Sequence, residues 1–143
     1  MSNFALSESQ HFEQSDLVAL YSSVGWSAYA ADPKSLVRAV DQSSYVVSAR
    51  NLTGKLIGLA RAVSDDVSIC FIQDILVDPD HQREGVGKTL LDHVRKRYRH
   101  VRQMVLITDD EPRQREFYES SGLIEVHDFT PTPLRAFVQI KSE

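Results

Sequence analysis

The feature that most constrains this chain is an apolar run that passes directly into a glycine-rich turn and then into an amphipathic helix. The run, VSICFIQDILV, extends from Val67 to Val77, and the turn holds Gly85 and Gly87. Apolar side chains then recur at helical spacing: Val86, Leu90, Leu91, Val94 and Tyr98. Because the segment VRQMVLIT, 101–108, is typical of a strand, the order predicts a right-handed strand-helix-strand crossover with parallel strands.

The segments before this crossover predict antiparallel pairing. SYVVSAR, 44–50, and KLIGLARAV, 55–63, flank the turn 51–54 and predict a hairpin. Two helices precede it, one capped by Ser15 and one that begins at Asp32 and Pro33. Antiparallel strands followed by a parallel crossover predict a mixed sheet.

The C-terminal part predicts one more helix and further strands. Pro112 at the first helical position and Gly122 after the last bound the helix, and short strands are expected near IEV, 124–126, and LRAFVQI, 134–140. We therefore predict an α/β (α+β) fold with a central mixed sheet of about six to seven strands flanked by about four helices. A length of 143 residues suits a single domain spanning 1–143.

Composition limits the classes of function. The single cysteine, Cys70, lies in an apolar run, which favours a buried inert thiol over a nucleophile, and the spacing of Cys and His predicts no metal site. No apolar run approaches the roughly 20 residues of a membrane span, and no targeting signal is visible near the N-terminus. We expect a cytoplasmic protein with no membrane partner.

One basic segment interrupts an acidic chain. The net charge is −4, yet residues 82–102 hold seven basic and two acidic residues. A single cluster of helix length is more typical of a solvated face or a local anion site than of a nucleic-acid surface. We therefore expect no nucleic-acid partner.

The glycine-rich turn resembles two nucleotide motifs but fits neither. A P-loop, Gly-x4-Gly-Lys-Ser/Thr, needs a glycine where this chain has Gln82, and a dinucleotide fingerprint needs its third glycine at Leu90. The pattern present in the chain is Gln82-x-x-Gly85-x-Gly87, between a predicted strand and the N-terminus of a predicted helix. Outward-pointing amides and the helix dipole at such a turn favour a pyrophosphate, although a tight turn without a ligand would have the same residues.

This turn resembles the acyl-CoA loop of the GNAT superfamily of N-acetyltransferases, whose pattern is Gln/Arg-x-x-Gly-x-Gly/Ala in the same setting. REFYESSGLIEV, 115–126, resembles the closing motif of that superfamily. The resemblance implies a GNAT-like acyl-CoA N-acyltransferase fold. It also implies an N-acetyltransferase that passes the acetyl group of acetyl-CoA, as co-substrate, to a primary amine of a small molecule by direct attack.

The resemblance also implies which residues bind the donor. Backbone groups of the strand before the loop would bind the pantetheine arm, the loop and the first turn of the helix would bind the diphosphate, and Phe117 would lie beside them. The strand and loop residues are Ile75, Leu76, Val77, Gln82, Arg83, Glu84, Gly85, Val86, Gly87, Lys88 and Thr89.

Four further residues are candidates for catalysis and acceptor binding. By resemblance, Tyr118 is the acid that protonates the departing thiolate; packing beside Phe117 is its alternative role. Asp74 shares a strand face with Cys70, Ile72 and Leu76 under strict alternation, where a carboxylate is costly unless partnered or protonated, so it is either a general base or a structural carboxylate. Trp26 and Tyr29 would form an aromatic wall for the acceptor, or Trp26 caps the core.

Two other classes of function stay open from the sequence. A non-catalytic acyl-CoA-binding sensor or regulatory module would share the fold, and an NTP-binding protein would respond to ATP and magnesium. The expected partner is a small-molecule amine, and a homodimer is compatible with the sequence.

Overall fold

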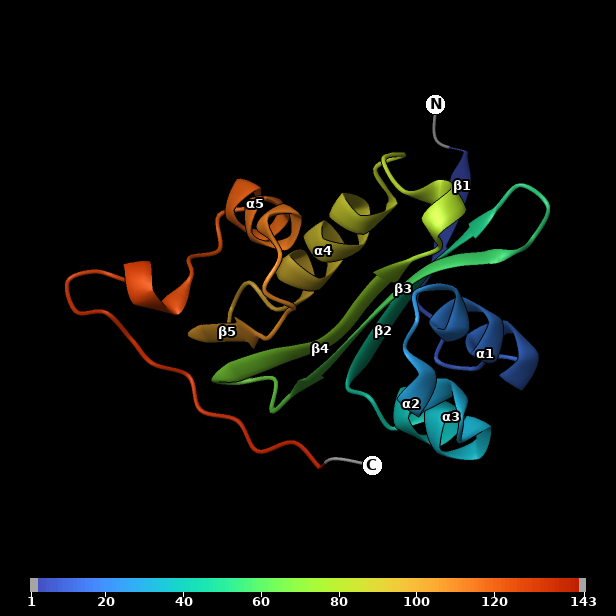
Figure 1. Cartoon of the computed structure of the whole chain (residues 1–143), viewed down its shortest axis with the longest axis horizontal. Helices are drawn as coiled ribbons and strands as arrows, with labels where there is room; N and C mark the ends of the chain where they lie inside the picture. Colours follow the sequence, from blue (N-terminus) through green and yellow to red (C-terminus); the bar gives the residue numbers. More distant parts are fainter. Residues whose placement is uncertain (1–2, 142–143) are drawn as a thin grey trace. The chain divides into compact units, whose positions relative to one another are not determined.

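A mixed sheet of five strands forms the first of two units into which the chain divides; this unit ends at Ile107. The structure, a computed structural model, describes residues 3–141, so residues 1–2 and 142–143 of the predicted domain lie outside it. The strands lie in the order β1 (Phe4–Ser7), β2 (Tyr45–Asn51), β3 (Leu56–Ser64), β4 (Ile69–Val77) and β5 (Gln103–Leu106). The first four pair antiparallel and β5 pairs parallel to β4, which confirms the mixed sheet and the crossover (Figure 1). Strand β1 was missed by the sequence reasoning.

Helices cover both faces of this sheet. On one side lie α1 (Gln14–Ser23), α2 (Ser27–Ala30) and α3 (Pro33–Asp41), and on the other lies α4 (Val86–Arg97) (Figure 1). The Asp32 side chain caps α3 by accepting from the Ser35 amide at 3.3 Å, as predicted. The predicted cap at Ser15 is wrong, because α1 begins at Gln14, two residues earlier than such a cap requires, and its N-cap is Glu13. A core of leucine and valine side chains joins α1 and α3 to the sheet: Leu17, Leu20, Leu36, Val40, Val46, Leu59 and Leu76.

A β-bulge in β4 changes which side chains share a face. Arg61 pairs with Asp74, whereas the next residue of β3, Ala62, pairs with Ile72, so Gln73 is the extra residue. Opposed residues of paired strands point to the same side of a sheet. Asp74 therefore faces α1 together with Arg61, while Ile72 faces α4 with Ala62. The expectation that Asp74 shares a face with Cys70 and Ile72 is wrong, because strict alternation does not survive a bulge.

Gly58 of β3 fixes how closely α4 approaches the sheet. A Cβ built on Gly58 would lie 2.7 Å from Val86 Cγ1, which is closer than carbon atoms pack, and 3.1 Å from Leu90 Cδ1, which is a tight contact. Val86 is the first residue of α4 and is buried. The glycine therefore positions the start of α4, and with it the turn that precedes the helix.

Replacing Gly58 with alanine should destabilise the protein by about 1–3 kcal/mol, because an added methyl in a filled core forces neighbouring atoms to move. Urea unfolding followed by circular dichroism measures the change. Ala60→Gly, two residues along the same strand and also buried, is the matched control, since it removes a methyl instead of adding one. Equal stability of Gly58→Ala and the natural protein would contradict the close approach.

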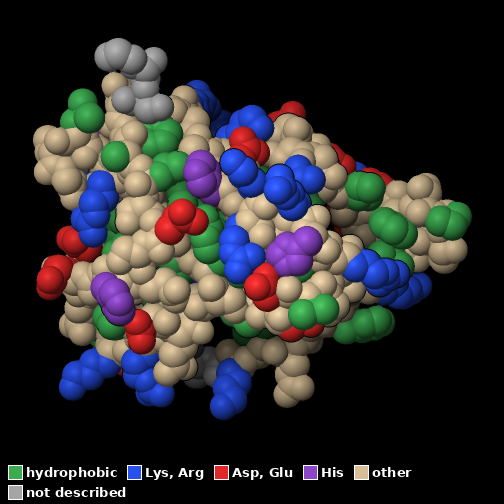
Figure 2. Space-filling view, turned by 180° about the vertical axis from the view of Figure 1, so that it is seen from behind, with side chains coloured by type: hydrophobic (Ala, Val, Ile, Leu, Met, Phe, Trp, Pro, Cys, Tyr) green, Lys and Arg blue, Asp and Glu red, His purple; other side chains and the backbone are tan. Residues whose placement is uncertain are grey.

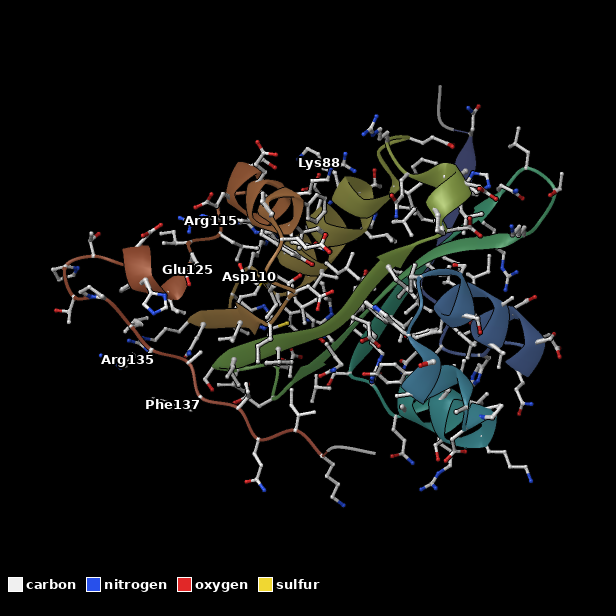
Figure 3. All side chains as sticks on the ribbon, viewed as in Figure 1. Lys88, Asp110, Arg115, Glu125, Arg135 and Phe137 are labelled. Atoms are coloured by element: carbon white, nitrogen blue, oxygen red, sulfur yellow. The ribbon has the colours of Figure 1, made fainter. Side chains whose placement is uncertain are left out.

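The second unit begins at Thr108 and holds α5 (Pro112–Ser120) and the short helix η2 (Val126–Asp128). Arg115 of α5, labelled in Figure 3, pairs with Glu119 at 3.2 Å and with Asp128, the last residue of η2. The helix bounded by Pro112 and Gly122 is confirmed.

The predicted strand number is too high and the predicted helix number slightly too low. Among the described residues, neither IEV nor LRAFVQI forms a strand: Val126 begins η2 and residues 133–141 have no regular structure. These strands were predicted wrongly because a segment forms a strand only when it pairs with another segment. Alternating apolar residues in one segment do not show whether such a partner exists. The fifth α-helix is the single turn α2, which is too short for periodicity to reveal.

Candidate functional site

The turn between β4 and α4 has backbone geometry that few residues adopt. After β4 the chain forms a short helix, η1 (Pro79–His81), and then passes through Gln82 to Gly85, the N-cap of α4. Arg83 and Gly85 both have positive φ, 68° and 84°. Such left-handed residues turn successive amides toward one point, which is the geometry of an anion-binding nest.

Backbone amides in this turn are left without carbonyl partners. Between Gln82 and Thr89, the backbone-to-backbone hydrogen bonds of residues 3–141 include none donated by an amide of the turn. Thr89 is the first to donate again, to the Gly85 carbonyl at 3.0 Å. The positive end of the α4 dipole lies at the same place. The turn is thus a ready site for an anion.

Asp78 ties the start of this turn to the sheet. Its amide donates to the Ile57 carbonyl at 2.8 Å, and its carboxylate accepts from the Asp80 amide at 2.9 Å and pairs with Lys55 at 3.2 Å. Burial opposes the charge of Asp78, yet the Asp80 amide and the Lys55 ammonium lower its pKa below the usual value. The residue is therefore a charged anchor of the turn at neutral pH.

The end of β4 lies open on the side of β5. The parallel ladder runs from Ile69 opposite Gln103 to Ile72 opposite Leu106 and stops there, while β4 continues to Val77. In the part of the chain that the structure describes, residues 73–77 have a strand partner only on the β3 side. Backbone groups of Ile75 to Val77 are therefore available to an extended ligand next to the amide-rich turn.

The arrangement of this strand, turn and helix agrees with a known family. A sequence profile described as the acetyltransferase (GNAT) family matches residues 10–123. The chain belongs to this family. Acetyl-CoA is the acetyl donor of GNAT proteins.

Individual relatives support the same assignment. This GNAT chain is 33% identical over 128 residues to the uncharacterized N-acetyltransferase ycf52 of Gracilaria tenuistipitata var. liui, covering 85% of this chain and 68% of that protein. It is 34% identical over 120 residues to histone acetyltransferase TAP1 of Glycine max, covering 75% of this chain but only 50% of the soybean protein. A GNAT family acetyltransferase of Streptococcus pneumoniae TIGR4 has a TM-score of 0.81 at 26% identity, with 98% and 99% of the two chains covered. The resemblance and the GNAT-like fold predicted from the sequence are confirmed.

The structure brings most of the predicted donor-binding residues of this GNAT protein together. Ile75, Leu76 and Val77 end β4, and the residues from Gln82 to Thr89 follow within one turn and the start of α4. The side-chain nitrogen of Gln82, Nε2, donates to the Val77 carbonyl at 3.5 Å across the turn. Lys88 (Figure 3) is exposed and lies 3.5 Å from Asp92, one turn further along α4.

Tyr118 and Phe117 lie in the second unit, on α5. Their rings meet edge to face, with centroids 4.9 Å apart. Burial raises the pKa of Tyr118 to about 12. The phenol therefore keeps its proton throughout the neutral range.

Asp74 has two strong partners that the sequence did not reveal. Its Oδ2 atom accepts from Arg61 Nε and from the Tyr21 hydroxyl, the latter at 2.8 Å, and both charged side chains are almost fully buried. Although burial disfavours the charge of Arg61, the Asp74 carboxylate raises the pKa of the guanidinium. Burial and the same carboxylate raise the pKa of Tyr21. Asp74 is therefore the shared acceptor at the centre of a buried polar cluster.

The signal that could have revealed this cluster is the hairpin itself. Arg61 is the one charged residue of β3, and Asp74 is the one charged residue of β4. Two oppositely charged side chains on neighbouring antiparallel strands form an ion pair when the register places them directly opposite each other. Tyr21 lies 53 residues before Asp74 in the chain, and no pattern in the sequence links the two residues.

The proposed acceptor residues adjoin this cluster. Trp26 and Tyr29 are partly buried and pack against the core formed by α1 and α3. Their ring centroids lie 5.8 Å and 5.3 Å from that of Tyr21. Gln73, the bulged residue, donates to the Tyr29 hydroxyl at 3.2 Å. The contacts support the core-capping role of Trp26, and its role toward an acceptor stays a prediction.

Cys70 and the basic segment hold no reactive centre of their own. Cys70 is buried, as expected, and burial raises the pKa of its thiol to about 11. In the basic segment, Arg97 pairs with Asp66 at 2.9 Å. Figure 2 shows Lys and Arg side chains lying among Asp and Glu side chains on the face that it presents.

The described residues contain neither a membrane-spanning helix nor a metal-binding cluster. No helix within residues 3–141 has the length and apolar character to cross a membrane. The same residues contain no group of three His, Cys, Asp or Glu side chains placed to hold a metal ion.

Proposed function

We propose that this chain transfers the acetyl group of acetyl-CoA to a primary amine of a small molecule. The acceptor nitrogen attacks the thioester carbon directly, the new C–N bond forms as the C–S bond breaks, and the coenzyme leaves as a thiolate that takes up a proton. The ammonium formed on the acceptor loses its proton to solvent or to a base. For such a reaction the protein mainly has to position the two substrates, to donate a hydrogen bond to the developing oxyanion and to transfer protons.

The observation that carries the proposal is the run of unpartnered amides from Arg83 to Lys88 beside the open end of β4. Amides, positive φ and the helix dipole suit the two negative charges of a diphosphate. The free backbone groups of Ile75 to Val77 suit the amide groups of a pantetheine arm. The chain's own residues thus fit acetyl-CoA, with Arg83 and Lys88 supplying positive charge at the rim.

Tyr118 is the proposed acid for the departing thiolate, on the strength of the motif that it shares with the family. Asp74 is proposed as a structural carboxylate, because both of its contacts go to buried side chains, Arg61 and Tyr21. A general base at Asp74 is the alternative role. We further propose that the whole chain acts as one N-acetyltransferase domain, because the family match crosses from the first unit into the second.

Gly85→Ala should weaken acetyl-CoA binding by about 10- to 100-fold, because a side chain is strained at φ +84° and the amides of the turn would rotate to relieve it. Isothermal titration calorimetry with acetyl-CoA measures the change. Gly54→Ala is the matched control: Gly54 has φ +89°, and a Cβ at either glycine meets nothing within 4 Å. Both variants should lose about 1 kcal/mol of stability, but only the first should lose affinity.

Three outcomes separate the candidate functions. Stabilisation by acetyl-CoA of roughly 2.7 kcal/mol at 100 times Kd, absent with ATP and magnesium, supports the donor site. Binding without release of free thiol from any amine in a panel of aliphatic and aryl amines would favour a sensor. Absence of acetyl-CoA binding in the natural protein would end the proposal.

A further inference from the structure

We propose that Gln73 holds the attacking nitrogen of the acceptor, which reacts as a neutral amine and passes its proton to water. This role rests on the proposed function, because it takes acetyl-CoA as the acetyl donor. Three observations carry it: the bulge in β4, the hydrogen bonds of Gln73 and Asp74, and the direction in which the donor site runs along the strand.

The β4 bulge directs Gln73 to the side of the sheet on which α1, α2 and α3 lie (Figure 1). Gln73 is the extra residue of β4, and a bulge often re-aims one side chain. Its Nε2 atom donates to the hydroxyl of Tyr29, on α2, at 3.2 Å. Gln73 is exposed, although its neighbour Asp74 is buried. Of these two adjacent polar side chains, Gln73 is therefore the one that a ligand can reach.

The hydrogen bonds of the two side chains give them different roles. Asp74 Oδ2 accepts from both Arg61 and Tyr21, so its carboxylate is engaged inside the protein. Gln73 uses Nε2 for Tyr29, and in the part of the chain that the structure describes no hydrogen bond of its Oε1 atom is found. An amide oxygen accepts hydrogen bonds but takes up no proton at neutral pH. Gln73 therefore offers a ligand a neutral hydrogen-bond acceptor.

The direction of the donor site places the thioester toward Gln73. The proposed diphosphate site is the turn after β4, so a pantetheine arm passes Val77 first and Ile75 last. The open stretch of β4 ends at Gln73, because Ile72 pairs with β5. A strand rises about 3.3 Å per residue, which puts Gln73 roughly 7 Å beyond Ile75. The reactive end of the donor and the Oε1 atom of Gln73 thus lie at the same end of this stretch.

A hydrogen bond to Gln73 leaves a neutral amine ready to react. The amine donates one N–H to Oε1 and keeps its lone pair for the thioester carbon, whereas a group that donated to the nitrogen would occupy that lone pair. The C–N bond forms as the C–S bond breaks, and the thiolate takes a proton from the proposed acid, Tyr118. The new ammonium then loses its N–H proton to water, because the amide of Gln73 cannot take it up.

The charges around Gln73 do not favour an ammonium over an amine. Within the first unit, the titratable side chains whose contacts lead to Gln73 are Tyr29, Asp74, Arg61 and Tyr21. The Arg61 guanidinium lies 5.8 Å from the centre of the Tyr29 ring. Because Arg61 and Asp74 form an ion pair that is neutral overall, the cluster has no net negative charge to attract a cation.

The test is the pH dependence of kcat/KM at saturating acetyl-CoA, with n-propylamine and glycinamide as acceptors. Their pKa values are about 10 and about 8, as for a lysine side chain and an α-amino group. With the natural protein, kcat/KM should rise about tenfold per pH unit and level off near pH 10 for the first and near pH 8 for the second. The reason is that only the neutral amine reacts.

Variants of Gln73 separate its role from a structural one. Gln73→Leu should lower kcat/KM for either amine by about 10- to 100-fold at unchanged acetyl-CoA affinity, because the nitrogen is no longer positioned. Gln103→Leu is the matched control, since Gln103 is also an exposed strand glutamine, and it should keep the natural rate. Gln73→Glu adds a carboxylate that can take the proton, so its kcat/KM should become nearly constant between about pH 5 and the pKa of the amine.

Other results would overturn the proposal. A natural protein whose kcat/KM is already constant below the pKa of the amine has a base of its own, and a natural rate in Gln73→Leu removes the contact. Turnover of other amines but of neither of these two places recognition elsewhere. Calorimetry with acetyl-CoA identifies the separate failure of the proposed function: no binding, or binding without turnover of any amine, ends that function and this role with it.

Discussion

Tyr118→Phe should lower kcat by about 10²- to 10³-fold while changing acetyl-CoA affinity by less than about twofold, because a positioned general acid contributes at least that much to a proton-transfer step. The phenol of Tyr118 keeps its proton because burial raises its pKa to about 12. A thiolate formed in similarly dry surroundings also becomes more basic, so the two groups can match where they would not in water. Release of free thiol from acetyl-CoA, with an amine found by screening, gives the rate.

The pH dependence supplies the internal control for this variant. A raised pKa keeps Tyr118 protonated below about pH 10, and the proton is lost as the pH rises through about 12. The natural protein should therefore show no fall in kcat due to Tyr118 at neutral or mildly alkaline pH, and the Phe variant should be slow throughout. No hydrogen bond of the Tyr118 hydroxyl is found in the described structure, so stability should hold. Equal rates at every pH would remove the acid role.

Arg61→Met should lower the free energy of unfolding by about 3–5 kcal/mol, because it leaves the Asp74 carboxylate buried without its counter-charge. That is a large part of the roughly 5–15 kcal/mol by which a domain of this kind is stable. Chemical unfolding monitored by circular dichroism measures the loss. Arg50→Met is the control on the neighbouring strand β2, where the pair with Asp16 is about one third exposed and should contribute less than about 1 kcal/mol.

A triple variant turns the same cluster into a test of Asp74. Arg61→Met, Asp74→Leu and Tyr21→Phe together remove both charges and the hydroxyl, and replacing a whole buried pair with apolar groups is often close to neutral. If Asp74 is a structural carboxylate, the folded triple variant should keep kcat within about tenfold. A loss of 10³-fold or more in a variant of natural stability would instead make Asp74 the general base.

The sequence alone determined the parts of this protein whose partners are close along the chain. The hairpin around residues 51–54, the cap at Asp32 and the succession of β4, glycine turn and α4 were all predicted. Each depends on interactions within a few residues, such as a side chain that bonds an amide three positions on. The donor-site hypothesis could be formed from the sequence for the same reason, since its residues from Ile75 to Thr89 lie in one continuous stretch.

Tertiary structure decided what depends on register and on distant partners. The bulge at Gln73 places Asp74 on the opposite face of the sheet from Ile72, where Arg61 and Tyr21 donate hydrogen bonds to its carboxylate. A pattern of alternating residues in the sequence does not reveal where one extra residue is inserted. Alternation also could not show that LRAFVQI has no strand partner among residues 3–141, whereas FALS, in β1, pairs with β2. A strand is stabilised by hydrogen bonds to another segment, so its existence is a property of the pair and cannot be read from either segment alone.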